Sequence, residues 1–412
     1  MLKLTFNNNI IDKNDLKNFV NKNFLNFIFI IDCISTAHIV AIMAKGKRIN
    51  CIYECKDITW RTTNYIKLYD MILSNVVFNT KKVVKIEHPF SVGGNNFFQR
   101  IANQNKFTKE IKNKIILKKN YIYVSSCISS ILLGNKNSVK HMLIDEGIGS
   151  ILPRHSYLFS KYNFKIYEKI KNYLSYKLLP FKFHPLTPQL TLTQDNHRSI
   201  LLNLDYMSFN SKIIFSKINF FLKKIKKYEN KVLVILKGPS PGKNFFPKEG
   251  DLLDDVYINF NFLGIKYFNN LMNFKKNTQF YLKQHPSLGK SLSKYDPLIR
   301  KLKIENISCL DLNKEFNFEE ASSLPAEILL RYCNFNFILA LDVTSLLWNI
   351  LSNNKVKCYL PIVDIINLAK NEDSQHLKIY KYQIKLNDLF GNKVNTFSFN
   401  YNKRNNSINY EN

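Results

Sequence analysis

The sequence predicts an α/β protein made of two lobes, each built around a mainly parallel β-sheet. The length of 412 residues fits two or three domains, at about 150 residues each. Short, continuous apolar runs alternate with helix-like segments, which is typical of strands buried on both faces of a parallel sheet. A proline-rich, polar stretch at 180–200 interrupts this alternation. We therefore expect one lobe at 1–200 and a second at 201–412, the latter ending in a loose tail.

The apolar runs predict eight strands. In the first lobe the predicted strands are 26–32, 82–87, 121–126 and 141–145. In the second lobe they are 231–237, 278–283, 336–341 and 357–362. Helical spacing of apolar residues predicts helices at 327–333 and 344–352. Because ligands bind beyond the carboxyl ends of the strands in doubly wound sheets, residues that carry chemistry should follow these runs.

The chain is strongly basic, with 60 lysines and arginines against 31 acidic residues and a formal net charge of +29. Part of the lysine excess fits an AT-rich coding sequence. The charge nevertheless produces a positive field that attracts phospholipid head groups, nucleic acid or acidic glycans. Only eight of the basic residues are arginines, the residue on which base and phosphate readout depends most. We therefore expect no nucleic-acid partner, and a basic nucleic-acid-binding protein is the least favoured alternative.

The apolar runs are too short to cross a membrane, since a transmembrane helix needs roughly 18 apolar residues. The N-terminus lacks the layout of a secretory signal, so we expect a cytoplasmic protein. Two basic amphipathic segments lie at 167–179 and 213–230. They predict either surface helices packed on the protein or helices that lie on a membrane. The second alternative implies peripheral contact with the inner face of the cytoplasmic membrane.

Two adjacent acids follow a predicted strand of the first lobe. The run HMLID continues into Asp145, Glu146 and Gly147. A single acid after a strand is ordinary in a turn. Two neighbouring carboxylates that face a cleft repel each other, which raises the pKa of one of them and makes it a better general base. A plain turn is the alternative.

Groups suited to phosphate follow two predicted strands of the second lobe. Lys283 and His285 lie two residues apart, on one side of an extended segment, and Pro286 would fix the turn that orients the histidine. Thr344 and Ser345 open a predicted helix. They either cap that helix or, with its N-terminal amides, bind a phosphate.

Together these residues resemble the motif set of the bacterial CMP-sialic-acid-dependent sialyltransferases. That family carries a D/E-D/E-G motif in its first lobe, an HP motif in its second lobe and a downstream serine/threonine pair. Here the motifs are Asp145-Glu146-Gly147, His285-Pro286 and Thr344-Ser345, within 141–350. Thr344 stands where serine is also common, and it keeps the hydroxyl. The resemblance implies a GT-B-like fold, in which two Rossmann-like lobes face a cleft.

The resemblance also implies an inverting transfer of sialic acid from CMP-sialic acid, without a metal or another cofactor. Asp145 would deprotonate the acceptor hydroxyl, with Glu146 as the alternative base, and His285 would assist the departure of CMP. The other residues of the set would bind the nucleotide: Gly238, Lys283, Pro286, Glu327, Thr344 and Ser345.

The implied acceptor is an anionic or galactose-terminated glycan of the bacterial cell surface. The positive net charge favours a polysialic acid capsule chain over a lipooligosaccharide terminus, because a basic groove would bind a chain of carboxylates. The alternative within the same fold is a GT-B glycosyltransferase that uses another nucleotide sugar.

Overall fold

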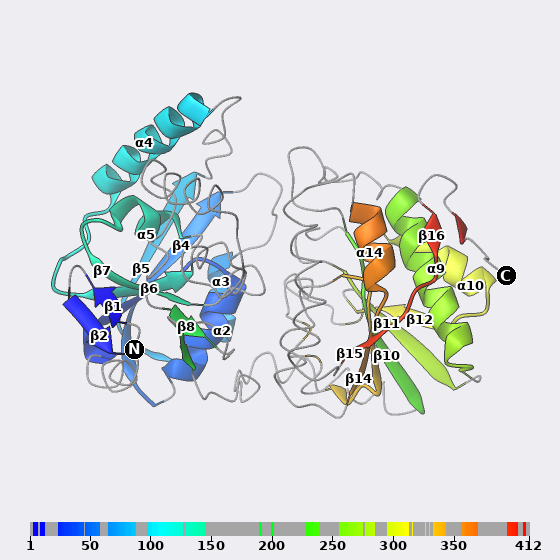
Figure 1. Cartoon of the computed structure of the whole chain (residues 1–412). Helices are drawn as coiled ribbons and strands as arrows, with labels where there is room; N and C mark the ends of the chain where they lie inside the picture. Colours follow the sequence, from blue (N-terminus) through cyan, green and yellow to red (C-terminus); the bar gives the residue numbers. More distant parts are fainter. Residues whose placement is uncertain are drawn as a thin grey trace. The chain divides into compact units, whose positions relative to one another are not determined.

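The protein, described here from a computed structural model, forms two compact units, each with its own parallel sheet (Figure 1). Unit 1 comprises Met1–Ile58 and Tyr65–Ser211, and unit 2 contains Lys212–Asn412. The described residues are 3–6, 9–12, 24–44, 46–57, 65–87, 97–126, 129–144, 189–191, 199–201, 228–238, 255–274, 277–284, 295–312, 315, 326, 329, 333–342, 356–369, 394–402 and 407–408.

Unit 1 is built on a seven-stranded sheet in which every neighbouring pair is parallel. Continuous apolar runs such as FIFII of β3 form its centre, where both faces are covered. In spatial order the strands are β5 (Val77–Glu87), β4 (Arg48–Asp57), β3 (Phe27–Ile31), β6 (Ile122–Ser126), β7 (Lys140–Ile144), β8 (Gln189–Thr191) and β9 (Ser199–Leu201). The antiparallel hairpin of β1 (Lys3–Phe6) and β2 (Asn9–Asp12) and the 3-10 turn η1 (Phe24–Asn26) precede the sheet.

Helices cover both faces of this sheet, as right-handed crossovers require when the direction of connection reverses (Figure 1). The helices are α2 (Ile34–Met43), α3 (Tyr65–Ile72), α4 (Phe97–Lys114) and α5 (Ser130–Asn135). The core under α4 and α5 joins helix residues such as Phe107 and Ile111 to strand residues such as Ile30 and Val84. Gly134 of α5 permits the close approach of α4, because a Cβ there would lie 2.8 Å from Ile111 Cγ2.

Unit 2 is built on a six-stranded sheet, also parallel throughout. In spatial order its strands are β12 (Cys309–Asp311), β11 (Thr278–Lys283), β10 (Asn230–Ile235), β13 (Phe337–Ala340), β14 (Lys357–Leu360) and β15 (Val394–Thr396). The described helices of this unit include α9 (Asp255–Leu271), α10 (Asp296–Ile304) and α14 (Ile362–Ala369), and β16 (Tyr401–Asn402) pairs with β17 (Ser407–Ile408).

The segment after β15 returns across α9 and closes the core of unit 2. The rings of Phe399 and Tyr401 contact Phe260 of α9, with centroid separations of 5.3 and 5.1 Å. Asp364 of α14 fixes the same segment, since its carboxylate accepts hydrogen bonds from Phe399 N at 3.0 Å and Tyr401 N at 2.7 Å. A buried carboxylate thus accepts from two backbone amides of this stretch, one of them at the start of β16.

The predicted α/β class with two parallel sheets is confirmed, and each of the eight predicted strands lies within or overlaps an observed one. The strand 77–87 begins five residues before its prediction, and β4 was not predicted at all. The helices predicted at 167–179, 213–230, 327–333 and 344–352 lie wholly or largely outside the described residues. The cleft between the lobes stays a prediction.

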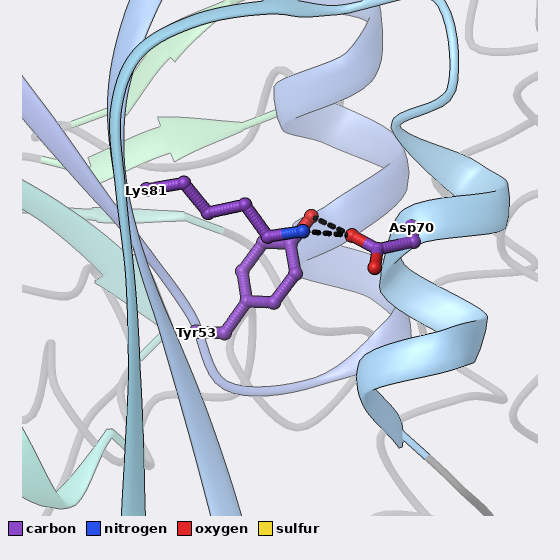
Figure 2. A network of polar contacts seen from close by, with 3 residues as sticks. All are labelled: Tyr53, Asp70 and Lys81. Atoms are coloured by element: carbon purple, nitrogen blue, oxygen red, sulfur yellow. Dashed lines mark hydrogen bonds and ion pairs between the residues drawn. The ribbon is translucent and has the colours of Figure 1, made fainter.

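A polar contact network joins α3 to the edge of the sheet in unit 1. Asp70 of α3 accepts a hydrogen bond from Tyr53 Oη at 3.0 Å and pairs with the ammonium of Lys81 (Figure 2). The Lys81 ammonium also lies 4.7 Å from the centroid of the Tyr53 ring. Burial raises the pKa of Tyr53, with the charge of Asp70 adding to it, so the phenol stays a neutral donor.

His141, at the start of β7, makes the stability of unit 1 depend on pH. Its ring pairs with Val139 O at 3.2 Å, and burial lowers its pKa from 6.5 to about 4. In the unfolded chain the imidazole takes up a proton below about pH 6.5, but in the folded protein it does not do so until about pH 4. The contribution of the neutral imidazole to the free energy of unfolding is therefore complete above pH 6.5 and is lost as the pH falls towards 4.

Between pH 7.5 and 4.5 we expect the free energy of unfolding of the wild type to fall by about 2 to 3 kcal/mol more than that of His141→Gln. Urea unfolding at the two pH values measures both. The comparison with the variant removes the common contribution of the carboxylates. Equal losses in the two proteins would show that His141 titrates normally in the folded state.

Candidate functional site

The direction of connection reverses at one point in each sheet. In unit 2 the chain passes from β10 to β11 and β12 on one side, and then crosses to β13, β14 and β15 on the other. The reversal therefore lies between β10 and β13, and in unit 1 it lies between β3 and β6. In open α/β sheets the crevice outside the carboxyl ends of the strands at such a point is the usual ligand site.

The carboxyl ends of three strands in unit 2 lie at the same level of the sheet. Ile235 of β10 is in register with Lys283 of β11 and with Ala340 of β13. The ladder continues beyond the strands, because Leu236 N donates to Lys283 O at 3.0 Å and Leu341 N donates to Ile235 O at 2.9 Å. The three segments that follow β10, β11 and β13 thus leave the sheet side by side.

This edge of the sheet carries a layer of buried polar side chains. Charged groups are rarely buried unless they are paired and hydrogen-bonded. Among the described residues at this edge there are two ammonium and two carboxylate groups, so the formal charges cancel. The members and their exposed fractions are Lys237 1%, Lys283 3%, Gln284 2%, Asp311 8% and Asp342 8%. At this edge of the sheet a layer of buried charged side chains therefore borders the apolar core.

Two helices hold the peptide groups of Lys237, directly before Gly238. The amide oxygen of Asn261, in α9, accepts from Lys237 N at 2.8 Å, and its amide nitrogen donates to Lys237 O at 2.9 Å and to Tyr257 O at 2.7 Å. Tyr295 Oη, at the start of α10, also donates to Lys237 O at 3.3 Å. An asparagine suits this position because its amide both accepts and donates. The backbone that leads into Gly238 is thereby fixed.

Electrostatics keep the Tyr295 hydroxyl a donor. Burial raises the pKa of Tyr295, and the negative charges of Asp342 and Asp311 raise it further. The ammonium groups of this layer bond to the strand-end backbone, since Lys237 Nζ donates to Gly238 O at 2.8 Å and Lys283 Nζ donates to Gln284 O at 3.3 Å.

Of the residues predicted for the site, the structure describes Gly238 and Lys283, both at the carboxyl edge of unit 2 and both buried. Lys283 is 3% exposed, so its contact with a nucleotide stays a prediction. The remaining predicted residues lie outside the described residues: Asp145, Glu146, His285, Pro286, Glu327, Thr344 and Ser345.

The strands that lead into these remaining residues are nevertheless well defined. The strand β7 ends at Ile144, immediately before Asp145, and β11 ends at Lys283, two residues before His285. The strand β13 ends at Ala340, four residues before Thr344. Each predicted motif thus begins close to the carboxyl end of a parallel strand.

Unit 1 has a buried carboxylate at its own reversal point, which the sequence analysis missed. Asp32 follows β3, is 6% exposed and accepts hydrogen bonds from Thr36 Oγ1 at 3.0 Å, from Ser125 Oγ at 3.2 Å and from Ser126 Oγ. It therefore joins the carboxyl ends of β3 and β6 to the first turn of α2. An acid directly after the run FIFII was the available sequence signal.

A second buried acid, Glu54 of β4, organises the turn between β6 and α5. Its carboxylate accepts hydrogen bonds from Ser129 Oγ at 2.6 Å, Ser130 N at 2.7 Å and Ile131 N at 3.2 Å. Glu54 is 1% exposed. It satisfies the amides at the start of α5, which have no partner within the helix.

The chain has a structural match among solved structures but no match in sequence to a known family. No protein-family model matches it, and no curated protein is similar to it in sequence. Among solved structures, it is similar to the UDP-GlcNAc 2-epimerase of Methanocaldococcus jannaschii, solved in complex with UDP-GlcNAc and UDP. The identity is 12%, the alignment covers 88% of this chain and 99% of the other, and the TM-score is 0.43. The fold class rests instead on the strand order and register of the two sheets.

Proposed function

We propose that the protein is a glycosyltransferase that takes its sugar from a nucleotide-sugar donor, and that this donor is CMP-sialic acid. The observation that carries the proposal is that β10, β11 and β13 end in register with one another, at the same level of the sheet. The segments that follow these strands contain Gly238, His285 and the pair Thr344-Ser345. Three segments that contain proposed nucleotide-binding residues thus follow strands that end at one edge of one sheet, at the point where α/β sheets bind ligands.

In this proposal unit 2 binds the nucleotide. Thr344 and Ser345 bind the phosphate together with helix N-terminal amides, and Glu327 binds the ribose. His285 donates a hydrogen bond or a proton to the phosphate oxygen as it takes the electron pair of the breaking C–O bond. Donors placed where negative charge develops lower the barrier without reorganisation. Pro286, Lys283 and Gly238 complete the nucleotide pocket.

Unit 1 supplies the base. Asp145, or alternatively Glu146, removes the proton from an acceptor hydroxyl, whose oxygen attacks the anomeric carbon from the face opposite to CMP. The configuration at that carbon is therefore inverted. The carboxylate of sialic acid itself stabilises the positive charge of the transition state, so the proposal requires no metal. In the sequence Asp145 directly follows β7, whose last three residues are at most 1% exposed.

For the acceptor we propose a polysialic acid chain, with a lipooligosaccharide terminus as the second choice. The formal net charge of +29 supports a polyanionic acceptor. A polysialic acid acceptor also predicts that the rate of transfer falls as salt is added, because exposed charges are screened.

The direct test is release of CMP from CMP-sialic acid with metals chelated, against a lactose-terminated glycan and a short oligosialic acid. Acceptor-dependent release supports the proposed reaction, and the preferred acceptor separates lipooligosaccharide capping from polysialic acid extension. The proposal fails if neither acceptor gives release and CMP does not raise the melting temperature.

A transferase that uses another, pyrophosphate-linked nucleotide sugar is the second candidate, because a ligand site at the reversal point between β10 and β13 does not depend on which nucleotide is bound. The two candidates separate in a melting experiment with free nucleotides. A ligand at 100 times its Kd stabilises a protein by about 2.7 kcal/mol. CMP should therefore raise the melting temperature and UDP should not, whereas the reverse result favours the second candidate.

Tyr295→Phe tests whether the Lys237 peptide positions Gly238, which the proposal assigns to the nucleotide pocket. Loss of one hydrogen bond of about 1 kcal/mol should loosen the backbone before Gly238. We expect KM for the donor to rise about three- to tenfold with little change in kcat, because the effect is on binding.

Tyr401→Phe is the matched control in the same unit, because Tyr401 Oη also donates to a backbone carbonyl, Val256 O, at 3.5 Å. The control should leave KM unchanged. If both variants shift KM equally, the effect is general loosening of unit 2 and Tyr295 has no positioning role.

A further inference from the structure

The orientation of α4 on unit 1 is fixed by its inner face. Gln104, Phe107 and Ile111 are at most 9% exposed and face the sheet and α5. Ile115 N donates to Ile111 O at 2.9 Å, so the helical backbone continues one residue past the end of α4. The opposite face is therefore turned permanently to the outside of the unit (Figure 1).

An exposed apolar residue lies at each end of this helix. Phe98, near its start, is 79% exposed, and Ile116, two residues past its last residue, is 90% exposed. Positions 11 and 14 residues after Phe98 return to the same side of a helix of 3.6 residues per turn. Lys109 and Lys112 therefore align with Phe98 along one stripe of α4.

The helix and the turn that follows it are also strongly cationic. Within residues 97–120 the only acid is Glu110. The exposed lysines of this segment are Lys106, Lys109, Lys112, Lys114, Lys118 and Lys119. Six exposed ammonium groups beside one carboxylate repel other cationic surfaces and attract an extended negative one.

We propose that the outer face of α4, together with the turn at 115–120, docks unit 1 on a bilayer of anionic phospholipids. Each lysine near such a surface contributes about 1 kcal/mol. Phe98 and Ile116 would enter the boundary between head groups and acyl chains, where an amphipathic helix places its apolar residues. No helix in the described part of the chain is long and apolar enough to span a bilayer.

The exposed apolar ends favour a bilayer over the other polyanions that lysines attract. A nucleic acid or an acidic glycan would pair with the ammonium groups but offers no apolar phase to Ile116. The proposal is independent of the sugar-transfer chemistry, since it uses none of the residues proposed for that reaction.

The test is sedimentation of the full chain with vesicles of phosphatidylethanolamine and phosphatidylglycerol, and with vesicles of phosphatidylcholine alone. We expect binding to the first only, weakened by salt. Lys109→Glu with Lys112→Glu lowers the net charge of the outer face of α4 by four units. It should weaken binding at least about tenfold. Phe98→Ser with Ile116→Ser should weaken it about tenfold without changing the charge.

The matched control is Lys303→Glu with Lys357→Glu, two exposed lysines of unit 2 with the same change in charge. It should bind as wild type does. The proposal is overturned if the control loses as much affinity as the α4 variant, which would indicate a general charge effect. It is also overturned if Phe98→Ser with Ile116→Ser binds normally while charge reversal abolishes binding, which would assign the face to a soluble polyanion.

Discussion

Asp145→Asn is expected to lower kcat for sugar transfer by about 10² to 10⁴-fold while the donor still binds, because general base catalysis contributes rate enhancements of that size. The change replaces the carboxylate by an amide of the same shape that cannot take up the proton of the acceptor. β7 should keep its place, since Ile144 is in register with Ser126 and both are buried. The measurement is initial rate of CMP release against donor concentration, with melting temperature as the check on folding.

The neighbouring acid supplies the matched control. Glu146→Gln makes the same chemical change one residue further along, and it should leave most of the turnover. If Asp145→Asn retains turnover and Glu146→Gln loses it, Glu146 is the base. If both variants retain turnover, the acids of this motif do not act as a base and the proposed reaction loses its first step.

Glu54→Ala is expected to destabilise unit 1 by about 3 to 5 kcal/mol, a large fraction of the 5 to 15 kcal/mol that domains typically have. The substitution removes the acceptor of three buried donors, Ser129 Oγ, Ser130 N and Ile131 N. A charged acceptor bonded to backbone amides is among the stronger protein hydrogen-bond arrangements. Urea unfolding measures the change.

Glu54→Gln should recover part of this loss, since one amide oxygen remains to accept. Glu110→Ala, at an exposed position of α4, removes the same side chain at the surface and should change the free energy of unfolding by less than about 0.5 kcal/mol. A loss below about 1 kcal/mol in Glu54→Ala would show that the α5 turn is held by its other contacts.

The sequence predicts strands well where burial is uniform and poorly where a buried polar group interrupts the apolar run. FIFII is buried at four of its five positions and TQFYLK at all six, and their strands were predicted almost residue for residue. The β4 segment RINCIYECKD contains Glu54, and its charge hid a strand whose residues 51–54 are all buried. The partners that make this burial tolerable lie 75 to 77 residues away, so no local pattern reveals them.

Long separation along the chain also limits what the sequence predicts about the site. The positions of Gly238 and Lys283 at strand ends follow from the rule that chemistry collects at carboxyl edges. The residues that hold the Lys237 peptide do not follow from it, because Asn261 and Tyr295 are 24 and 58 residues away on two helices. Three-dimensional packing alone identifies them.

The long outer strand of unit 1 has a consequence for self-assembly. β5 has eleven residues, and no described strand pairs with its outer side, so its backbone is a template for a strand from another copy. Lys81, Lys82 and Lys85 are exposed along it, and Asp70 and Tyr53 hold the first of them in place (Figure 2). Two such edges would bring their ammonium groups together. In a chain rich in β-forming aromatic residues, this charged border opposes sheet-by-sheet polymerisation into fibrils.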